Sequence, residues 1–440
     1  MFPLHIKTRR FICRTAFLIF GVAPLAAAAS WAAVVNSTMH LSALRAQLAD
    51  RSKMSVELNG VAYPQPSVTL MEGLQLRDPE TDQTIATIRT VQIERHADHE
   101  LVLLSQPELN IAAVNSLTRL ISKVLRPSAD AKGDPPMRLA AGELTLRWAS
   151  GVQTFTEAEV DLGSPGKASS LWATFHLANS PLAMPLKLQA ERTVESQTCG
   201  VNIKLDTGDA PLPCSLICAV LNRNNRLGPQ STLRGKLQVS EMPDGWQAEF
   251  AGRLEQIDLN AAITDQFPHQ LSGSATLDVK HALIHAGRLE QFEGTLQAGP
   301  GIVSSSLVAA AAEMLGMRRE FAQNYQMPAA DGRIPYEMLA VDLRLENGGL
   351  IVNGRCGGKT GVVLRGKGSA ILSESTAGPA PIVALVKMLV PDSRLQVPAT
   401  RQTDWLLNML PIPDVVPHDS QALPQVRIHS PTAIPSDGWH

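Results

Sequence analysis

Cysteines and histidines at short spacings are the features of this chain that come closest to a chemical site. Cys214 and Cys218 lie one helical turn apart, but no second pair of cysteines or histidines accompanies them, so we expect no zinc site. Together with Cys199 and Cys356 they would form two disulfide bridges in an oxidising compartment. Because a body of this size does not need such bridges, buried free thiols are an equal alternative, and the sequence leaves the choice open.

Two histidine pairs and one glycine-rich turn complete the candidate sites. His96 and His99 lie in a polar turn, where we expect no metal. His281 and His285 have a strand-like pattern, in which four residues span about 13 Å, too far for both rings to bind one ion. Residues 299–301 (Gly-Pro-Gly) indicate a helix entry rather than a phosphate site. The chain also lacks the common nucleophile, zinc-protease and nucleotide motifs, so we expect no catalytic residue, metal, cofactor or enzymatic activity.

The composition is that of a globular protein and argues against nucleic-acid binding. Of the 440 residues, 44% are apolar, enough for a sizeable core in two or three domains or in one elongated domain. Only 4% are aromatic and the net charge is -2, so the chain offers few stacking platforms for bases and no basic field for phosphates. We therefore expect no nucleic-acid partner.

The N-terminus carries a segment that is typical of a membrane anchor. Residues 1–14 contain Lys7, Arg9, Arg10 and Arg14, whereas residues 15–35 contain no charged residue. At about 1.5 Å per residue, a helix over this segment would cross the roughly 30 Å hydrocarbon core of a bilayer. The basic flank predicts a cytoplasmic N-terminus and an exported body. The side chains expected to hold the anchor in the membrane are those of Phe17, Leu18, Phe20, Leu25, Trp31 and Val35.

A cleaved signal peptide is the competing interpretation of this segment. The alanines at 26–29 offer A-x-A cleavage sites. Against cleavage, the apolar residues continue to Val35, and a helical pattern of Leu41, Leu44 and Leu48 follows without a break. We favour a single uncleaved helix. Both interpretations place the body outside the cytoplasm, in the periplasm if the cell has a Gram-negative-type envelope.

From residue 54 onward the dominant pattern alternates apolar and polar residues, which is typical of strands with one apolar face. It extends over 143–148, 171–177, 201–205, 233–239, 246–252, 271–279, 292–298, 339–345 and 362–372. Helical spacing is confined to 111–126, 213–222 and 302–323. These few helices are not enough to cover the apolar faces of so many strands. The apolar face must therefore meet another sheet, close on itself, or meet something other than protein.

The order of these elements resembles that of the AsmA-like envelope proteins, which are related to TamB-type bridge-like lipid-transfer proteins. A membrane helix, the strand MSVELNGVAYPQP at 54–66, the segment 67–94 and a strand at 101–111 precede an amphipathic helix, as in the N-terminal module of that family. Residues 271–298, 334–353 and 361–372 resemble its closing module. The Pro-rich segment after Ser373 lies outside the resemblance.

The resemblance implies a mainly β fold, in which an N-terminal transmembrane helix leads into an elongated, curved antiparallel β-sheet. That sheet would form a taco-like groove, with a few short amphipathic helices and an irregular Pro-rich tail. The expected divisions are a cytoplasmic basic segment 1–14, an anchor 15–35, an N-terminal module 36–127, a linker 128–136, a groove body 137–372 and a tail 373–440. The residues expected to line the groove are Leu144, Leu146, Phe175, Leu177, Leu233, Leu237, Leu277, Leu296, Leu343, Leu345 and Leu364.

Such a protein would bind or pass lipid acyl chains along the groove, in envelope lipid transport or outer-envelope assembly. Membrane lipids would be its ligands, and envelope proteins would contact its tail. The alternative is a structural or assembly factor with a packed β-body that transports nothing and acts through protein partners. A continuous open cavity lined by the alternating residues would favour the first function over the second.

Overall fold

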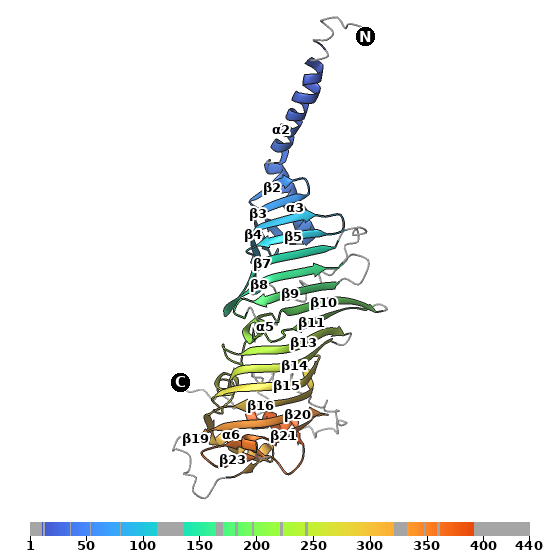
Figure 1. Ribbon diagram of the computed structural model, residues 1–440. Coiled ribbons are helices and arrows are strands. Elements are labelled where there is room, and N and C mark those ends of the chain that lie inside the picture. The colour runs from blue at the N-terminus through green and yellow to red at the C-terminus, as the bar shows by residue number, and fades with distance from the viewer. Residues whose placement is uncertain are drawn as a thin grey trace, which may run out of the picture.

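Figure 1 shows the computed structural model, which describes residues 11, 14–35, 37–52, 54–79, 81–111, 136–163, 170–180, 184–195, 198–220, 223–242, 245–320, 332–346, 348–358 and 361–390. A long stack of strands carries a projecting helical segment at its N-terminal end and small helices at its other end. Within the described residues, 22 strands form one sheet and two more form a separate pair. The prediction of a mainly β fold is confirmed.

The strands of the large sheet follow one another along the molecule in nearly the order of the sequence (Figure 1). The first are β1 (Ser55–Glu57), β2 (Gly60–Gln65), β3 (Val68–Arg77), β4 (Thr84–Arg95), β5 (Glu100–Ser105), β6 (Glu108–Asn110), β7 (Met137–Trp148), β8 (Gly151–Leu162), β9 (Ser170–Leu177), β10 (Leu186–Glu195), β11 (Thr198–Asp206) and β12 (Leu212–Pro213). The rest are β13 (Thr232–Met242), β14 (Gly245–Asp258), β15 (Ser274–His285), β16 (Arg288–Ala298), β18 (Arg318–Arg319), β20 (Met338–Glu346), β21 (Gly349–Gly354), β22 (Val362–Arg365), β23 (Ala370–Ser373) and β24 (Ala380–Pro381). The separate pair is β17 (Gly301–Ser304) and β19 (Arg333–Tyr336).

Most neighbouring strands are consecutive in the chain and therefore pair antiparallel, as β13 and β14 do over their whole length. The exception is β7, which lies parallel to β5 and β6. A parallel neighbour requires a long crossover, and the chain between Ile111 and Pro136 has the necessary length. The purely antiparallel sheet expected from the sequence is thus corrected to a mixed one.

Several bulges interrupt the regular pairing of the long strands, and two of them contain a residue with a positive φ value. The register between β8 and β9 shifts between Thr156 and Glu159, and the register between β14 and β15 shifts between Leu254 and Ile257. Glu157 and Gln256 lie inside these shifts, with φ values of 52° and 55°. An extra residue in such a conformation bends its strand and increases the local twist. The bulges therefore contribute to the curvature of the sheet.

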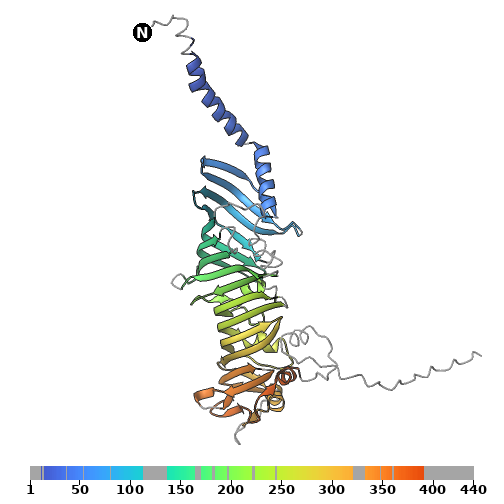
Figure 2. The ribbon, with the colours of Figure 1, turned by 90° about the vertical axis from the view of Figure 1, so that its right-hand side faces the viewer.

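Four helices lie against one face of the sheet: α3 (Thr38–Ser52), α5 (Cys214–Val220), α6 (Ser305–Met314) and α7 (Ile382–Leu389). In Figure 2, α3 and the two C-terminal helices lie on the same side of the stack of strands. Helix α3 contacts the first strands through Leu41, Leu44 and Leu48, at the spacing that the sequence predicts. Helices α6 and α7 share one apolar cluster with the last strands.

The predicted helices agree with the structure to different degrees. The helix predicted over 213–222 is confirmed as α5. The helix predicted over 302–323 begins later, because Ile302 lies in β17, where it pairs with Pro335 of β19. The Ser304 hydroxyl accepts a hydrogen bond from the Leu307 N–H and caps α6, and Gly316, at a φ of 66°, follows its C-terminus. The helix predicted over 111–126 and the linker 128–136 lie outside the described residues, apart from Ile111 and Pro136.

The predicted anchor segment is helical in two parts, a π-helix at Leu18–Val22 and α2 (Ala23–Val35). In the part of the chain that the structure describes, no helix combines the length and the apolar character needed to cross a membrane. The prediction of one membrane-spanning helix over 15–35 is therefore not supported by the structure. Nor does the helical pattern continue unbroken into α3, because the Ser37 hydroxyl accepts a hydrogen bond from the His40 N–H and starts a new helix.

The body extends past the boundary predicted at residue 372. Strand β24 pairs with β21, and α7 buries Ile382, Ala384 and Val386 in the C-terminal apolar cluster. This short apolar stretch has helical spacing, so it covers the end of the sheet instead of forming an irregular tail. The remainder of the predicted tail, residues 391–440, lies outside the described residues.

A glycine pair permits a close approach of backbones in the centre of the sheet. Gly235 of β13 and Gly252 of β14 lie opposite each other, with φ values of 138° and 159°. A Cβ on Gly235 would lie 2.3 Å from the Ala251 carbonyl oxygen, which belongs to a paired strand and has no room to move. The Gly235 N–H donates to the Thr207 hydroxyl (2.8 Å), and the Thr207 N–H donates to the Gly235 carbonyl (2.9 Å). These bonds hold the point where the chain leaves β11.

We expect Gly235→Ala to lower the free energy of unfolding by about 1–3 kcal/mol or more, because the new Cβ meets backbone atoms and the φ value is unfavourable. Urea unfolding measures the change. Gly142→Ala in β7 is the matched control, since its Cβ would meet no atom within 4 Å, and it should change stability by less than about 0.5 kcal/mol. Equal effects of the two substitutions would show that the glycine pair imposes no constraint.

Candidate functional site

The register of the strands shows which side chains line up on one face, because residues paired directly across strands point to the same side. One such line crosses thirteen strands from β4 to β21, and every member is apolar. The members of this apolar row are Ile93, Val102, Leu139, Val160, Ala173, Leu188, Leu205, Leu237, Phe250, Ala282, Phe292, Leu345 and Leu350. At about 4.8 Å between strands, the row is about 58 Å long.

All of the residues predicted to line a groove lie on this face of the sheet. Leu237 and Leu345 are members of the apolar row itself. The others occupy the same face on strands β7, β9, β13, β15, β16, β20 and β22: Leu144, Leu146, Phe175, Leu177, Leu233, Leu277, Leu296, Leu343 and Leu364. Alternation in the sequence thus located the face, while its contact with lipid stays a prediction.

The exposure of these side chains changes along the face. Leu345 and Leu364 are 2% and 3% exposed and belong to the cluster beneath α6 and α7. Leu177 and Leu233 are also buried. The remaining predicted groove residues are half-buried: Leu144, Leu146, Phe175, Leu237, Leu277, Leu296 and Leu343. In the apolar row, Ile93, Leu139, Val160, Leu188, Leu205, Leu237, Phe250 and Phe292 are half-buried. The C-terminal end of the face is therefore a packed core, and its longer remaining part is only partly covered.

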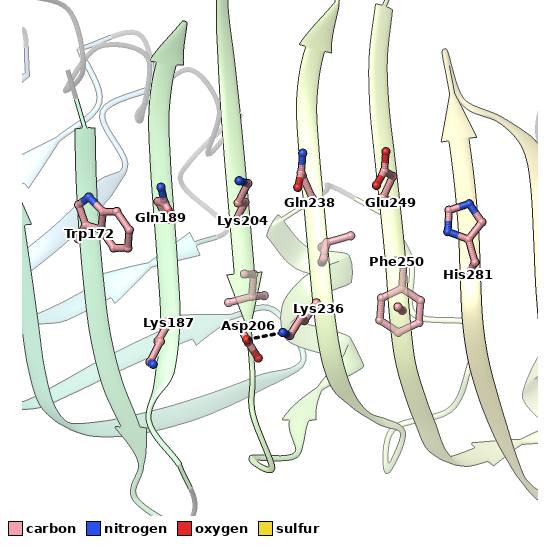
Figure 3. Close-up of a pocket in the computed structure, with 13 residues that line it drawn as sticks. Trp172, Lys187, Gln189, Lys204, Asp206, Lys236, Gln238, Glu249, Phe250 and His281 are labelled. Carbon is pink, nitrogen blue, oxygen red and sulfur yellow. Dashed lines mark ion pairs between the residues drawn. The ribbon is translucent and has the colours of Figure 1, made fainter. Parts of the chain in front are cut away.

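The opposite face carries polar side chains in the same strict alignment. Trp172, Gln189, Lys204, Gln238 and Glu249 are direct cross-strand partners on five successive strands. Figure 3 shows them side by side, with His281 at the end of the row. We term these five residues the polar row. It faces away from α5, whose apolar side chains contact the other side of the sheet.

The polar row lies in a hollow of about 380 Å³ on this face. A second line of cross-strand partners, Lys187, Asp206 and Lys236, also lines the hollow. Ala251, His281 and three members of the apolar row, Leu205, Leu237 and Phe250, complete the lining. The Lys236 ammonium lies 3.5 Å from the Asp206 carboxylate. Residue patterns in the sequence did not predict this hollow. The feature of the sequence that could have indicated the hollow is Trp172, a large aromatic residue at a polar-face position of an alternating strand.

The cysteines form no disulfide among those whose side chains are described: Cys214, Cys218 and Cys356 are free thiols. The side chain of Cys199 lies outside the described residues, so the choice between disulfides and free thiols is settled for the other three only. Burial raises the pKa of the Cys214 thiol to about 11, against a smaller opposing effect of its hydrogen bond with Ser231. Burial also raises the pKa of Cys218 and of Cys356. Protonated, buried thiols of this kind are poor nucleophiles.

The histidine pairs behave as ordinary polar residues. The rings of His96 and His99 stack with their centroids 4.7 Å apart, and each lies near a carboxylate, of Glu94 and Asp98 respectively. The His99 side chain, hydrogen-bonded to Asp98, lowers the pKa of that carboxyl. No group of three potential metal ligands occurs among the described residues. His285 lies 3.3 Å from Glu290, while His281 lines the polar hollow, so the structure does not join them in one site.

The predicted anchor residues lie at the projecting N-terminal segment. Phe17, Leu18, Phe20 and Leu25 are 69%, 57%, 81% and 72% exposed, so the body covers little of them. Trp31 and Val35 belong to α2, and their side chains lie outside what the structure describes. The described anchor residues therefore present apolar side chains that the sheet does not cover.

No family model, no curated protein and no solved structure matches this chain. The resemblance to the AsmA-like envelope proteins thus stays a prediction that rests on the order of the elements. What the chain does has to be inferred from its two faces and its N-terminal segment.

We expect Cys214 to react slowly with iodoacetamide at pH 7.5 in the native protein and rapidly after denaturation, as measured by mass spectrometry of the labelled peptides. Because its pKa is raised in the folded state, the thiol contributes stability below its ordinary pKa of 9.0, and this contribution is lost as the pH rises toward about 11. Cys214→Ala should therefore weaken the decline in stability over that interval. Rapid labelling of native Cys214 would contradict the buried thiol.

Proposed function

We propose that this chain is an extracytoplasmic envelope protein, held at a membrane by its N-terminal segment, that binds or passes lipid acyl chains along the apolar row. The observation that carries the proposal is the unbroken alignment of apolar side chains over thirteen strands. Its members beyond the packed C-terminal end are mostly half-buried, so they keep surface for a ligand. No enzymatic activity is part of the proposal.

Acyl chains are the ligand class that best fits such a surface. Each CH₂ group removed from water contributes about 0.8 kcal/mol, and no directional contact is required. A polar side chain in the row would cost free energy wherever an acyl chain passed over it. Since every member of the row is apolar, a chain would meet no such barrier along about 58 Å of the sheet.

The N-terminal segment supports placement at a membrane. Its exposed side chains include Phe17, Phe20 and Leu25, and no charged residue lies between Thr15 and Val35. Contiguous apolar surface of this kind marks a contact with a membrane or with another protein. Four basic residues precede it, which favours a cytoplasmic N-terminus and a body on the other side.

A packed structural or assembly factor is the second candidate, and one observation favours it. The C-terminal end of the apolar face is covered by α6 and α7, and Leu345, Val363 and Ile371 are buried there. If the remaining face were covered as completely by other parts of the chain or by a partner, no lipid would enter. The two functions differ in whether lipid contacts the centre of the apolar row.

The full-length chain is expected to remain in the membrane fraction after carbonate extraction. Replacing both Phe17 and Phe20 by Lys should release much of it, because a Lys at the centre of a membrane segment costs about 2.5–3.5 kcal/mol. Met39→Lys, at an equally exposed position of α3 beyond the segment, is the control and should leave the fractionation unchanged. Recovery of a soluble species that begins near Ser30 would instead establish a cleaved signal peptide.

The full-length protein in detergent should crosslink to a phospholipid with a photoactivatable acyl chain. Leu237→Asp should strongly reduce crosslinking, because it places a carboxylate in the centre of the apolar row. The neighbouring Gln238→Asp puts the same group on the opposite face and should leave crosslinking unchanged.

Thermal unfolding of the same variants separates a loss of binding from a loss of fold. Leu237 is half-buried, so Leu237→Asp should lower the melting temperature much less than Leu345→Asp, which buries a charge in the packed cluster. An absence of crosslinking in the unmodified protein, with equal destabilisation by both substitutions, would establish the packed structural protein.

A further inference from the structure

The hollow that contains the polar row, here termed the polar hollow, offers polar side chains that the proposed lipid path does not use. Its centre is the polar row, in which Trp172 and Glu249 are four strand steps apart, a distance of about 19 Å at the usual strand spacing. The hollow measures about 380 Å³ and is partly open. It is therefore an elongated, shallow site that would suit a chain-like ligand lying across the strands.

Trp172 provides an apolar platform at one end of this site. Its side chain is 51% exposed although it stands on a strand whose neighbours Leu171 and Ala173 point to the apolar face. An exposed indole in the middle of a polar surface binds flat, partly apolar ring faces, and it offers them a large area at little cost in conformational entropy. The next partner in the row, Gln189, adds an amide beside it.

The charges of the site favour an acidic ligand. Among its lysines, Lys236 is paired with Asp206 at 3.5 Å. Lys187 and Lys204 are exposed, and neither forms an ion pair with a residue that the structure describes. The Glu249 carboxylate accepts a hydrogen bond from the Gln247 amide at 2.9 Å. Two ammonium groups thus stay available for a negatively charged ligand, and the Gln189 and Gln238 amides flank Lys204 on the two neighbouring strands.

The position of the hollow argues against a peptide as the ligand. It lies in the middle of the sheet, where strands β9, β10, β11, β13, β14 and β15 each pair with neighbours. Their backbone groups are already used, so a peptide would find no edge on which to add a strand. Recognition has to come from side chains alone, through ring stacking, hydrogen bonds to hydroxyl groups and ion pairs.

We propose that the polar hollow binds an acidic oligosaccharide. One sugar ring stacks on Trp172. Hydroxyl groups of this and the following rings bind the Gln189 and Gln238 amides, and carboxylate groups along the oligosaccharide bind the Lys187 and Lys204 ammonium groups. The side chains proposed to bind the glycan point to the face opposite the apolar row, although Leu205, Leu237 and Phe250 of that row contribute to the lining of the hollow. The proposal does not depend on lipid binding.

Isothermal titration calorimetry of the full-length protein in detergent tests this site, with tetragalacturonate as the probe. The unmodified protein should bind it and should bind neutral chitotetraose much more weakly. Trp172→Ala should weaken binding about tenfold, and Trp172→Phe should retain most of the affinity, because a smaller aromatic ring still stacks. Lys204→Gln should weaken binding and reduce its dependence on salt concentration.

Lys367→Gln is the matched control, because Lys367 is exposed on a turn of the C-terminal end, outside the hollow. It should bind tetragalacturonate as the unmodified protein does. Trp172 and Lys204 are both exposed, so their variants should keep the melting temperature of the unmodified protein. No detectable binding, or equal binding by Trp172→Ala and the unmodified protein, would overturn the proposal. Tighter binding of a tetraglutamate peptide than of the sugar would overturn it in favour of a peptide site.

Discussion

The alignment of apolar side chains across strands depends on a constraint that acts at every strand pair. In a β-sheet, a shift of register by one residue moves the whole apolar set of a strand to the other face. A line of thirteen apolar partners therefore requires that each pairing keep its register, including those that contain bulges. The same condition gathers Trp172, Gln189 and Lys204 on the opposite face. One set of hydrogen-bonded pairings thus sets the position of both surfaces.

An exposed strand edge can pair with another chain, and the two ends of the sheet prevent this in different ways. At the N-terminal edge, β2 contains Pro64, which has no N–H to offer a further strand, and α3 lies beside it on one face. At the C-terminal end, the short strands β22, β23 and β24 join α6 and α7 in one buried cluster. Ile371 and Leu345 are almost completely buried in that cluster, so the end of the sheet is closed by a packed core.

The sequence allowed the face of many strands to be predicted, because alternation is a local property of each strand. It located Leu237 and Leu296 on one side and Lys236 and Gln297 on the other before any pairing was known. Properties that depend on distant segments could not be predicted in this way. The parallel pairing of β7 and the strand at Ile302 each depend on a partner far along the chain.

The same distinction between local and long-range properties applies to the candidate site. The residues of the apolar face followed from alternation, whereas the polar hollow did not, since it is formed by six strands that lie side by side. The helical stretch at 382–389 was too short for its periodicity to stand out from a Pro-rich segment, and only its burial against the sheet identifies it. The N-terminal helix has two parts instead of the single helix that the sequence predicts. A π-helical turn changes the backbone hydrogen bonding, and the amino-acid composition gives no indication of it.

The pairing of each strand with its immediate neighbours makes the molecule nearly one-dimensional. From β7 to β16 the strands join nearest neighbours in the sheet, so the ends of the ladder do not touch its middle. In such a structure, the stability is a sum of contributions from each strand and its contacts with neighbouring strands. Strands can therefore be added or removed in the middle without disturbing the two ends. A hairpin inserted in the middle would lengthen the body by about 10 Å and keep both faces in phase. The length of this protein is therefore a variable that evolution or a designer can adjust in steps of two strands.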